Sequence, residues 1–392
     1  MEIKQIIIIL IIINSILLCG CTDHDPSDQI DKGKTIYVND DGGKDFQRIQ
    51  DAIDNANQED TIFVYSGFYR ENVNITKSLT LEGEDKETTI IDGDGHNDCI
   101  LVLSNSVTIT GFTIQNSGDK GYYFSSEESY SGHEGYLYWD SGIDIYKNVS
   151  DTNIIDTQII NTKYGIHFST DSFNNTINSN YFQQNNAVGL YFVGSDTNQV
   201  MKNTFFNNSQ NAYLAYSNNN ILEENVFGVT TTTHNIYFAE SSNNTVTRNT
   251  IKNCKHGIFL DCNGNNDNLI SFNQISNHQT GVYIRGIEEN VSSMATPSIN
   301  NKLIGNSIHN NKEGILITSY SNLIYNNNIY DNTYNANDTG DNTWYNEEMN
   351  QGNYWGDYSG VDSNGDGIGD IPYDISNGQN SDTYPLITRY QS

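Results

Sequence analysis

Positive charge is scarce in this 392-residue chain. Lysine and arginine together number 19, against 49 aspartate and glutamate residues, so the formal net charge is −30. Binding to the phosphates of nucleic acid requires a basic face, and this composition therefore excludes nucleic acid as an expected partner. An acidic polymer would also be repelled, whereas an acidic exterior suits a protein on a cell surface.

Cysteine, methionine and clustered histidine are also in short supply. The chain has 5 Cys, and only Cys99, Cys254 and Cys262 follow the amino-terminal segment, an odd number that implies no disulfide framework. Copper sites require clusters of His, Met or Cys. The 4 Met and 8 His residues form no Met-rich or His-x-His motif and no repeating column, so copper binding is not expected.

The long apolar run of the chain lies at its amino terminus. Lys4 precedes a run from Ile6 to Leu18, which ends in Leu-Cys-Gly-Cys21. Because the run is short and leads to small residues, it is typical of a secretory signal rather than a spanning helix. Leu-x-Gly-Cys resembles the lipobox of exported lipoproteins, so residues 1–21 are predicted to be a lipoprotein signal with Cys21 lipidated. A lipid on Cys21 would tether the protein to the extracellular or periplasmic face of the membrane; plain cleavage and an uncleaved anchor are the alternatives.

A repeat of about 22 to 24 residues dominates the rest of the sequence, as in 174–192, 243–260, 267–284 and 300–317. A short fixed period predicts a stacked solenoid, because one unit cannot bury its own hydrophobic face. Each unit has two Asn positions, and an apolar residue stands two residues after each of them. A small residue follows and begins a short segment in which apolar and other residues alternate. The first Asn column is Asn175, Asn198, Asn220, Asn244, Asn268, Asn301 and Asn322, the second is Asn180, Asn203, Asn225, Asn249, Asn273, Asn306 and Asn327, and the small column is usually Gly165, Gly189, Gly257, Gly281 or Gly314.

Alternation with period two indicates strands rather than helices. Asn and Gly supply the turns between them, because they tolerate positive φ. Asn side chains stacked coil upon coil can also hydrogen-bond along a ladder. We therefore predict an all-β fold, a parallel β-helix with three short strands per coil and about ten coils.

The segment before the repeats is organised differently. Residues 35–38 are predicted to form a strand, and apolar residues at 46, 49, 52, 53 and 56 lie on one face of a predicted helix within 45–56. Since a solenoid needs ends that shield its core, this helix is expected to be the amino-terminal cap. Strands at 61–65, 78–81 and 89–92 then begin the winding.

These segments resemble a known family. QRIQDAIDNA, DTIFVYSGFYREN, KSLTLEG and TIIDG resemble the start of pectin-lyase-like right-handed β-helix proteins, while the repeats and GNYWGDY near the end resemble the NosD-type family of β-helix surface proteins, also described as CASH repeats. The resemblance implies a right-handed, single-stranded parallel β-helix, capped at both ends. The expected organisation is a signal at 1–21, a linker at 22–33, the amino-terminal cap and first coils at 34–95, repeats at 96–340 with an insertion at 117–141, and a carboxyl-terminal cap at 341–392.

An acidic loop in the carboxyl-terminal cap has the spacing of a calcium-binding loop, with oxygen side chains at positions 1, 3, 5 and 9 and Gly at position 6. The candidate ligands are Asp362, Asn364, Asp366 and Asp370. Position 12 is Tyr373 rather than Glu, so the bidentate ligand is missing unless Asp374 or Asp357 supplies it. A structural calcium ion that holds the cap closed is expected; the alternative is a solvated acidic turn.

The middle residue of each segment after the small column should face outward. The predicted outward column is Asp144, His167, Tyr191, Leu214, Tyr237, Phe259, Tyr283 and Leu316. Its aromatic members Tyr191, Tyr237, Phe259 and Tyr283, with Tyr138 and Trp139 of the insertion, are candidates for stacking on sugar rings. The alternative is an aromatic ladder that stabilises neighbouring strands or is covered by a loop.

Two charged pairs are the catalytic candidates. Asp144 and His167 occupy adjacent coils, so they can lie about 5 Å apart as an acid/base pair, and Asp261 and Arg285 form a second such pair. A lyase or epimerase needs a cation for the sugar carboxylate and a base for its C5 proton, but Arg285 and His167 lie in separate coils. The sequence has no clustered Asp triad of the polygalacturonase type and no metal-binding Asp set like that of pectate lyases.

We interpret the sequence as an exported, non-catalytic protein that binds a neutral cell-envelope or extracellular glycan. One alternative is a carbohydrate-active enzyme, namely a polysaccharide lyase, hydrolase or epimerase that works at residues 117–141, Asp144 and His167. A purely structural envelope module is the second alternative.

Overall fold

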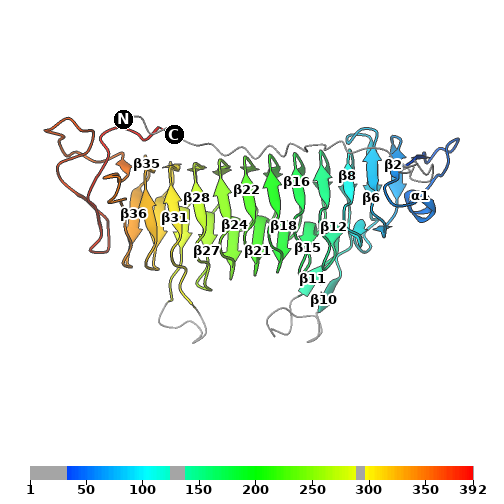
Figure 1. Cartoon of the computed structure of the whole chain (residues 1–392), viewed down its shortest axis with the longest axis horizontal. Helices are drawn as coiled ribbons and strands as arrows, with labels where there is room; N and C mark the ends of the chain where they lie inside the picture. The colour runs from blue at the N-terminus through cyan, green and yellow to red at the C-terminus, as the bar shows by residue number, and fades with distance from the viewer. Residues whose placement is uncertain (1–32, 124–136, 288–295, 392) are drawn as a thin grey trace, which may run out of the picture. The chain divides into compact units, whose positions relative to one another are not determined.

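The repeats fold into a parallel β-helix whose coils each supply one strand to three long sheets (Figure 1). The computed structural model describes residues 33–123, 137–287 and 296–391. Two of the sheets have 12 strands and the third has 11, so the solenoid has about 12 coils rather than the ten predicted. At the amino-terminal end, β1 (Thr35–Val38), β2 (Thr61–Val64) and β5 (Thr80–Gly83) of the cap region already pair in register with one another and with β8 (Thr108–Thr110).

The strands of each sheet follow in spatial order. The first sheet contains β1 (Thr35–Val38), β2 (Thr61–Val64), β5 (Thr80–Gly83), β8 (Thr108–Thr110), β13 (Asn153–Ile155), β16 (Thr176–Asn178), β19 (Gln199–Met201), β22 (Ile221–Glu223), β25 (Thr245–Thr247), β28 (Leu269–Ser271), β31 (Lys302–Ile304) and β34 (Leu323–Tyr325). The second contains β3 (Gly67–Arg70), β6 (Thr89–Asp92), β9 (Thr113–Gln115), β14 (Gln158–Ile160), β17 (Tyr181–Gln183), β20 (Thr204–Phe206), β23 (Val226–Phe227), β26 (Thr250–Lys252), β29 (Gln274–Ser276), β32 (Ser307–His309), β35 (Asn328–Tyr330) and β37 (Tyr354–Trp355). The third contains β4 (Val73–Ile75), β7 (Ile100–Val102), β12 (Ser141–Ile145), β15 (Tyr164–Phe168), β18 (Val188–Val193), β21 (Gln210–Ala215), β24 (His234–Ala239), β27 (His256–Leu260), β30 (Thr280–Ile284), β33 (Glu313–Ile317) and β36 (Tyr334–Asp338).

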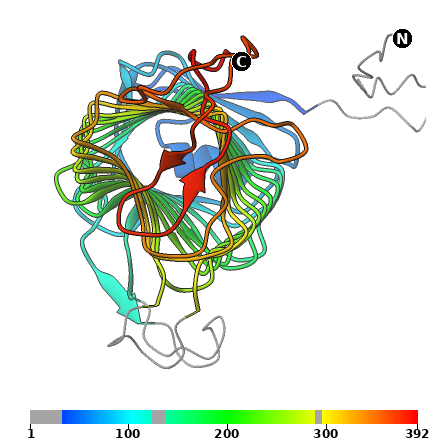
Figure 2. The same cartoon turned by 90° about the vertical axis from the view of Figure 1, so that its left-hand side faces the viewer.

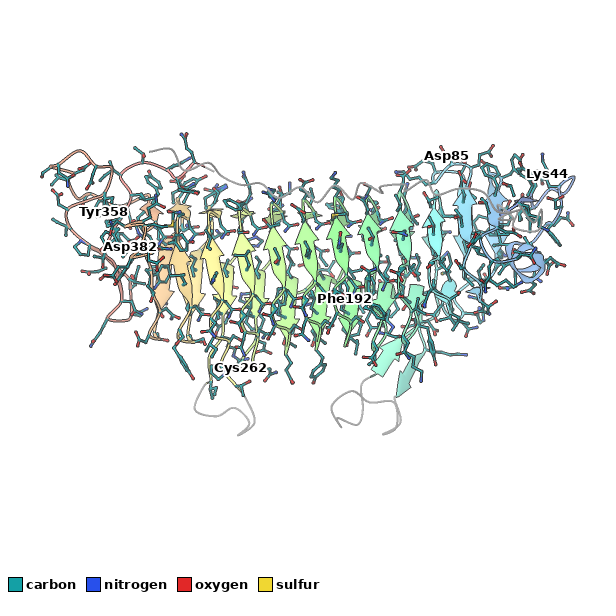
Figure 3. The ribbon with its side chains drawn as sticks, viewed as in Figure 1. Lys44, Asp85, Phe192, Cys262, Tyr358 and Asp382 are labelled. Atoms are coloured by element: carbon teal, nitrogen blue, oxygen red, sulfur yellow. The ribbon has the colours of Figure 1, made fainter. Side chains whose placement is uncertain are left out.

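The two ends of the core are covered by different elements. The helix α1 (Ile49–Asn55) lies across one opening and the short hairpin of β38 (Tyr373–Asp374) and β39 (Ser381–Asp382) lies across the other (Figure 2). The side chains of the carboxyl-terminal cap, including Asp382 and Tyr358, are shown in Figure 3. The predicted amino-terminal cap is thus present, although its helix is shorter than the predicted segment.

Side chains of the following coil cap both ends of α1. The Glu71 carboxylate accepts the backbone N–H groups of Ile49 at 2.9 Å and Gln50 at 3.1 Å. At the other end, the Lys77 ammonium group donates to three carbonyls, at distances from 2.8 to 3.0 Å. A helix of this length has few internal hydrogen bonds, so these contacts and the burial of its apolar face hold it in place.

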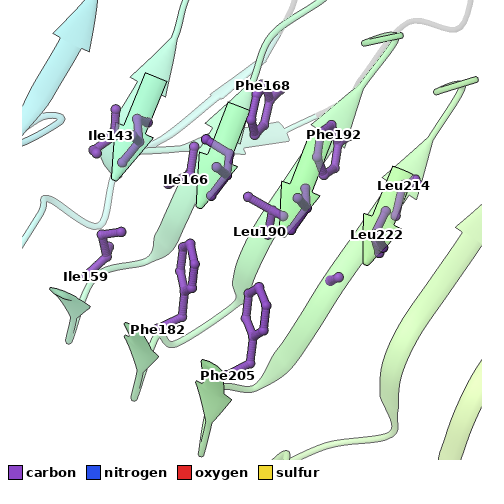
Figure 4. Packing of buried hydrophobic residues seen from close by; sticks show 14 of the residues in the cluster. Ile143, Ile159, Ile166, Phe168, Phe182, Leu190, Phe192, Phe205, Leu214 and Leu222 are labelled. Carbon is purple, nitrogen blue, oxygen red and sulfur yellow. The ribbon is translucent and has the colours of Figure 1, made fainter. Parts of the chain in front are cut away.

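Apolar side chains from all three sheets fill the interior. Identical residues stack from coil to coil, as in Phe168 on Phe192, with ring centroids 4.3 Å apart, and Phe182 on Phe205, with centroids 4.5 Å apart (Figure 4). These rings are completely buried. Each coil therefore completes the core of its neighbours, as the repeat predicted.

The predicted Asn ladders are present at two corners of the solenoid. Within the second ladder, for example, Asn225 donates its backbone N–H and its Nδ2 to Oδ1 of Asn249, at 2.8 and 3.0 Å, and also donates Nδ2 to the Val200 carbonyl at 2.8 Å. These Asn side chains are almost fully buried. The residue before each ladder Asn has the positive φ, for instance Arg248 at 54°. The ladder Asn residues therefore make the hydrogen bonds of the turns, and the residues before them adopt the left-handed conformation.

Among the residues that the structure describes, no helix has both the length and the apolar character needed to span a membrane. Cys21 lies outside the described residues, and its lipidation stays a prediction.

Candidate functional site

The outer face of the third sheet carries the candidate residues in one column. The strand register aligns Asp144, His167, Tyr191, Tyr213, Tyr237, Phe259 and Tyr283, one from each successive coil. We call this set the outer column. It matches the predicted column except at one coil, where Tyr213 replaces Leu214.

The placement of Leu214 on the outer face was wrong. Leu214 is fully buried and points into the core beside Phe192 (Figure 4). The register pairs it with Phe192 and pairs Tyr213 with Tyr191. In this coil Asn211, rather than a glycine, stands opposite Gly189. The prediction therefore used the next small residue, Ala212, as the start of the segment. This shifted the assignment by one residue, which moves a side chain to the opposite face of the strand.

The aromatic residues of the outer column form a continuous ladder of ring contacts. Successive ring centroids from Tyr191 to Tyr283 are 4.6 to 5.3 Å apart. Tyr191 and Phe259 are only 6% and 7% exposed, while Tyr213, Tyr237 and Tyr283 are half-buried. The column is therefore not a bare aromatic platform, and the ring-to-ring contacts of the alternative ladder are present.

The Asp144 and His167 pair lies at the amino-terminal end of the column. His167 Nδ1 is 3.3 Å from Asp144 Oδ1, which also accepts a hydrogen bond from the Ser169 hydroxyl at 3.2 Å. Their side chains are 0% and 4% exposed. The structure thus brings the predicted pair together but buries it.

A third carboxyl group, which the sequence interpretation missed, adjoins this pair. Asp98 accepts the backbone N–H of Ser141 at 2.6 Å. Burial and the neighbouring Asp144 raise the pKa of Asp98 to about 8. A carboxyl group with a perturbed pKa is a candidate for acid/base chemistry, and Asp98, unlike Asp144 and His167, is only partly buried.

The second predicted pair is more accessible and includes a tyrosine. Arg285 Nη1 donates to Asp261 Oδ1 at 3.1 Å, and the Tyr237 hydroxyl donates to Asp261 Oδ2 at 2.5 Å. The side chains of Arg285 and Asp261 are 28% and 15% exposed. Burial alone would raise the pKa of Asp261, but the hydrogen bonds from Tyr237 and Arg285 outweigh it and lower that pKa. Asp261 is therefore an ionised acceptor beside a cation.

Two histidines line up beside the outer column, against the expectation that no column of histidines exists. His234 and His256 are in register, and their rings stack with centroids 5.3 Å apart. Burial lowers the pKa of each to about 4. His278 lies one coil further, at a corner, with its Nδ1 3.3 Å from Cys254 Sγ.

Along the axis of the solenoid, the outer column lies between the hairpin of the predicted insertion and a second connecting segment. The hairpin of β10 (Gly121–Tyr123) and β11 (Leu137–Trp139) precedes β12, and a second segment follows β30. Figure 1 shows this hairpin and the described ends of the second segment on the same side of the solenoid, with β15 to β27 between them. Tyr138 and Trp139 belong to β11, while the middle of the predicted insertion lies outside the described residues.

The side chains of the acidic loop close their own turns. Asp362 accepts the backbone N–H groups of Gly365 and Gly367 at 2.7 and 2.9 Å, and Asp370 accepts that of Ser363 at 3.0 Å. Asp366 and Asn364 make similar local bonds. The loop is folded through these bonds, and calcium binding there stays a prediction.

The fold and face define this chain as a parallel β-helix protein with a polar and aromatic outer face. The model of the NosD family, described as periplasmic copper-binding protein (NosD), matches residues 128–294 and 288–360, which together span more than half of the chain. The chain therefore belongs to the NosD family, as the sequence resemblance predicted. No curated protein matches it.

Solved structures with the same fold include three with low sequence identity. PfbA, a surface adhesin of Streptococcus pneumoniae, is 13% identical, with 87% of this chain and 94% of that chain covered and a TM-score of 0.57. The A-module of the mannuronan C-5 epimerase AlgE6 of Azotobacter vinelandii is 16% identical, with 78% and 92% covered and a TM-score of 0.52. ORF18 of Geobacillus virus E2 is 16% identical, with a TM-score of 0.53; 76% of this chain is covered, but only 58% of the viral protein.

The description of the NosD family names copper. Throughout the described ranges, no three His, Cys, Asp or Glu side chains converge so that they could hold a metal ion. The Cys254 and His278 side chains contact each other, but both also bond to backbone carbonyls. These residues do not fit a copper site.

Proposed function

We propose that this protein is exported and binds a neutral polysaccharide along the outer face of the third sheet, between the two insertions, without cleaving it. The observation that carries the proposal is the Tyr237, Asp261 and Arg285 cluster. It combines an aromatic ring, an ionised acceptor and a cationic donor at a partly exposed position.

The chemistry of this cluster favours a neutral sugar. The Asp261 carboxylate can accept hydrogen bonds from sugar hydroxyls, and Arg285 can donate to them. Because Asp261 already balances the charge of Arg285, the pair offers no net positive charge to a uronic acid. The net charge of −30 opposes an acidic polymer further.

The half-buried tyrosines extend this site along the axis. Tyr213, Tyr237 and Tyr283 belong to successive or nearly successive coils about 5 Å apart. An elongated ligand could therefore contact several coils at once, with an aromatic edge or hydroxyl at each. The same fold serves an adhesin and an epimerase, by their names, but at 13% and 16% identity these neighbours share only the fold.

Burial is the reason to propose binding rather than catalysis. A general acid or base must reach the substrate, directly or through a water molecule. Asp144 and His167 are almost completely buried. The raised pKa of Asp98 favours the second candidate function, a carbohydrate-active enzyme at Asp98, Asp144 and His167.

The test combines binding with product detection. The purified protein is mixed with neutral polysaccharides such as cellulose, starch and galactomannan, and with alginate as an acidic comparison. Retention on a neutral polymer, weakened about tenfold or more by Arg285→Ala, with no product supports the proposal. Phe206→Ala is the matched control, because Phe206 is exposed in the coil of Tyr213 but belongs to the second sheet.

Two other results would contradict it. Product that disappears in His167→Ala would favour the enzyme. Absence of binding to every polymer would favour a structural envelope module.

For localisation, we propose a lipid anchor at Cys21. Cys21→Ser should then remove the association of the protein with membranes, and unchanged association would refute the anchor.

A further inference from the structure

A separate pocket lies at the carboxyl-terminal end of the third sheet. It has a volume of about 320 Å³ and is formed by the last coils and by the cap residues Ser376 and Asn377. Ser376 pairs with Asn337 beyond β36, and Asn377 Nδ2 donates to Asn337 Oδ1 at 2.9 Å. The cap therefore continues the sheet and closes one side of the pocket.

Three coils build the opposite wall. Thr280, Glu313 and Tyr334 are the first residues of β30, β33 and β36, and the strand register aligns them. Ala336 stands where the preceding coil has Ile315. Both side chains are buried, and Ala336 contributes an apolar surface to the lining of the pocket.

The lining offers hydrogen-bond donors and acceptors in equal measure. The amides of Gln279 and Asn377 can do both, Lys312 donates and Glu313 accepts. The single positive and single negative charges balance. The lining therefore favours a ligand that carries many hydroxyl groups and no net charge.

An aromatic ring completes this chemistry. Tyr334 is 59% exposed. Its ring can stack on the apolar face of a sugar. A volume near 300 Å³ is at the lower end of the range for small-molecule sites, which suits one or two sugar residues.

We propose that this pocket binds a neutral mono- or disaccharide, free or as the end of a glycan chain. The inference rests on the proposed function for its class of ligand. It goes further because it places a sugar in a defined pocket, apart from the face that contacts the chain.

The experiment is calorimetric titration of the full protein with D-glucose, D-galactose, N-acetyl-D-glucosamine, cellobiose and maltose, and with D-glucuronate. Saturable binding of at least one neutral sugar is expected. Tyr334→Ala and Asn377→Ala should each weaken it about tenfold or more, the loss of one good contact. Tyr146→Ala, which removes an exposed tyrosine after β12, should leave it unchanged.

The outcomes separate this inference from the proposed function. Arg285→Ala should weaken polysaccharide binding about tenfold or more and leave the binding of the small sugar unchanged. Polysaccharide binding without any sugar binding overturns the pocket alone. Sugar binding that survives both Tyr334→Ala and Asn377→Ala, or tighter binding of glucuronate than of glucose, also overturns it.

Discussion

Asp382 ends the Asn ladder that reaches Asn353. The carboxylate Oδ2 accepts the backbone N–H of Asn353 at 2.6 Å and its Nδ2 at 3.3 Å, as each ladder Asn accepts from the coil before it. The same oxygen accepts the Trp355 indole N–H at 2.8 Å. Because the ladder donates in one direction, its last member needs only to accept, which an ionised carboxylate does best.

Removal of this ladder end should destabilise the protein. Asp382→Ala leaves several buried donors without a partner, and we expect a loss on the order of 3 kcal/mol in the free energy of unfolding. Asp382→Asn, which keeps one acceptor oxygen, should cost less. Denaturant unfolding measures both, with the exposed Asp374→Ala of the same hairpin as control. Equal stability of Asp382→Ala and Asp374→Ala would refute this role.

Acid should weaken the fold through buried histidines. His278 Nδ1 lies 3.3 Å from the Cys254 backbone N and Nε2 lies 3.1 Å from the Ile251 carbonyl, an arrangement that suits the neutral ring. Burial lowers the pKa of His278 from about 6.5 to about 4. Since the folded pKa is the lower one, the stabilisation is complete above pH 6.5 and is lost as the pH falls through about 4.

The matched variant is His278→Asn. Asn311 occupies this position in the next coil and accepts the His278 backbone N–H at 2.9 Å, so an asparagine fits the corner. Between pH 7.5 and 4.5, the unfolding temperature of His278→Asn should fall less than that of the unmodified protein. The difference between the two proteins should correspond to at most about 3 kcal/mol in the free energy of unfolding. Parallel pH profiles of the two proteins would contradict this account.

Calcium should raise the stability of the folded protein and should not affect its binding of polysaccharide. We propose that one calcium ion draws together the side chains of Asp362, Asn364, Asp366 and Asp370, whose carboxylates do not converge on one point in this structure, and holds the cap. Thermal unfolding should then occur several degrees higher in millimolar calcium than in a chelator, and Asp366→Ala should remove the difference. If the unfolding temperature does not depend on calcium, the loop is a solvated turn that is closed by its own hydrogen bonds.

The sequence predicted the features that repeat and missed those that do not. The Asn ladders and core columns follow from one period, since each residue type recurs where its environment recurs. Tyr213 was missed because Asn211 replaced the glycine used for alignment. The alignment of Tyr237 with Phe259 was correct and already placed His234 opposite His256, three residues before each, but the histidines were compared over the whole chain, where they form no column.

Contacts between distant parts of the chain gave no sequence signal. Glu71 caps a helix more than 20 residues before it, and Asp382 joins a ladder 29 residues after Asn353. Outward direction could be predicted from alternation, but exposure could not, because His167 lies on the outer face and is nevertheless buried. Of the two predicted pairs, exposure therefore favours Asp261 and Arg285 over Asp144 and His167 as part of a binding site.

The most direct test of the proposed binding face is hydroxyl-radical footprinting of the protein with and without a neutral polysaccharide that it retains. The account predicts reduced oxidation of Tyr213, Tyr237 and Tyr283, while Phe206 and Tyr37, which are exposed on the other two sheets, stay unchanged. Protection of Phe206 or Tyr37 without protection of the outer column would show that the polysaccharide binds elsewhere.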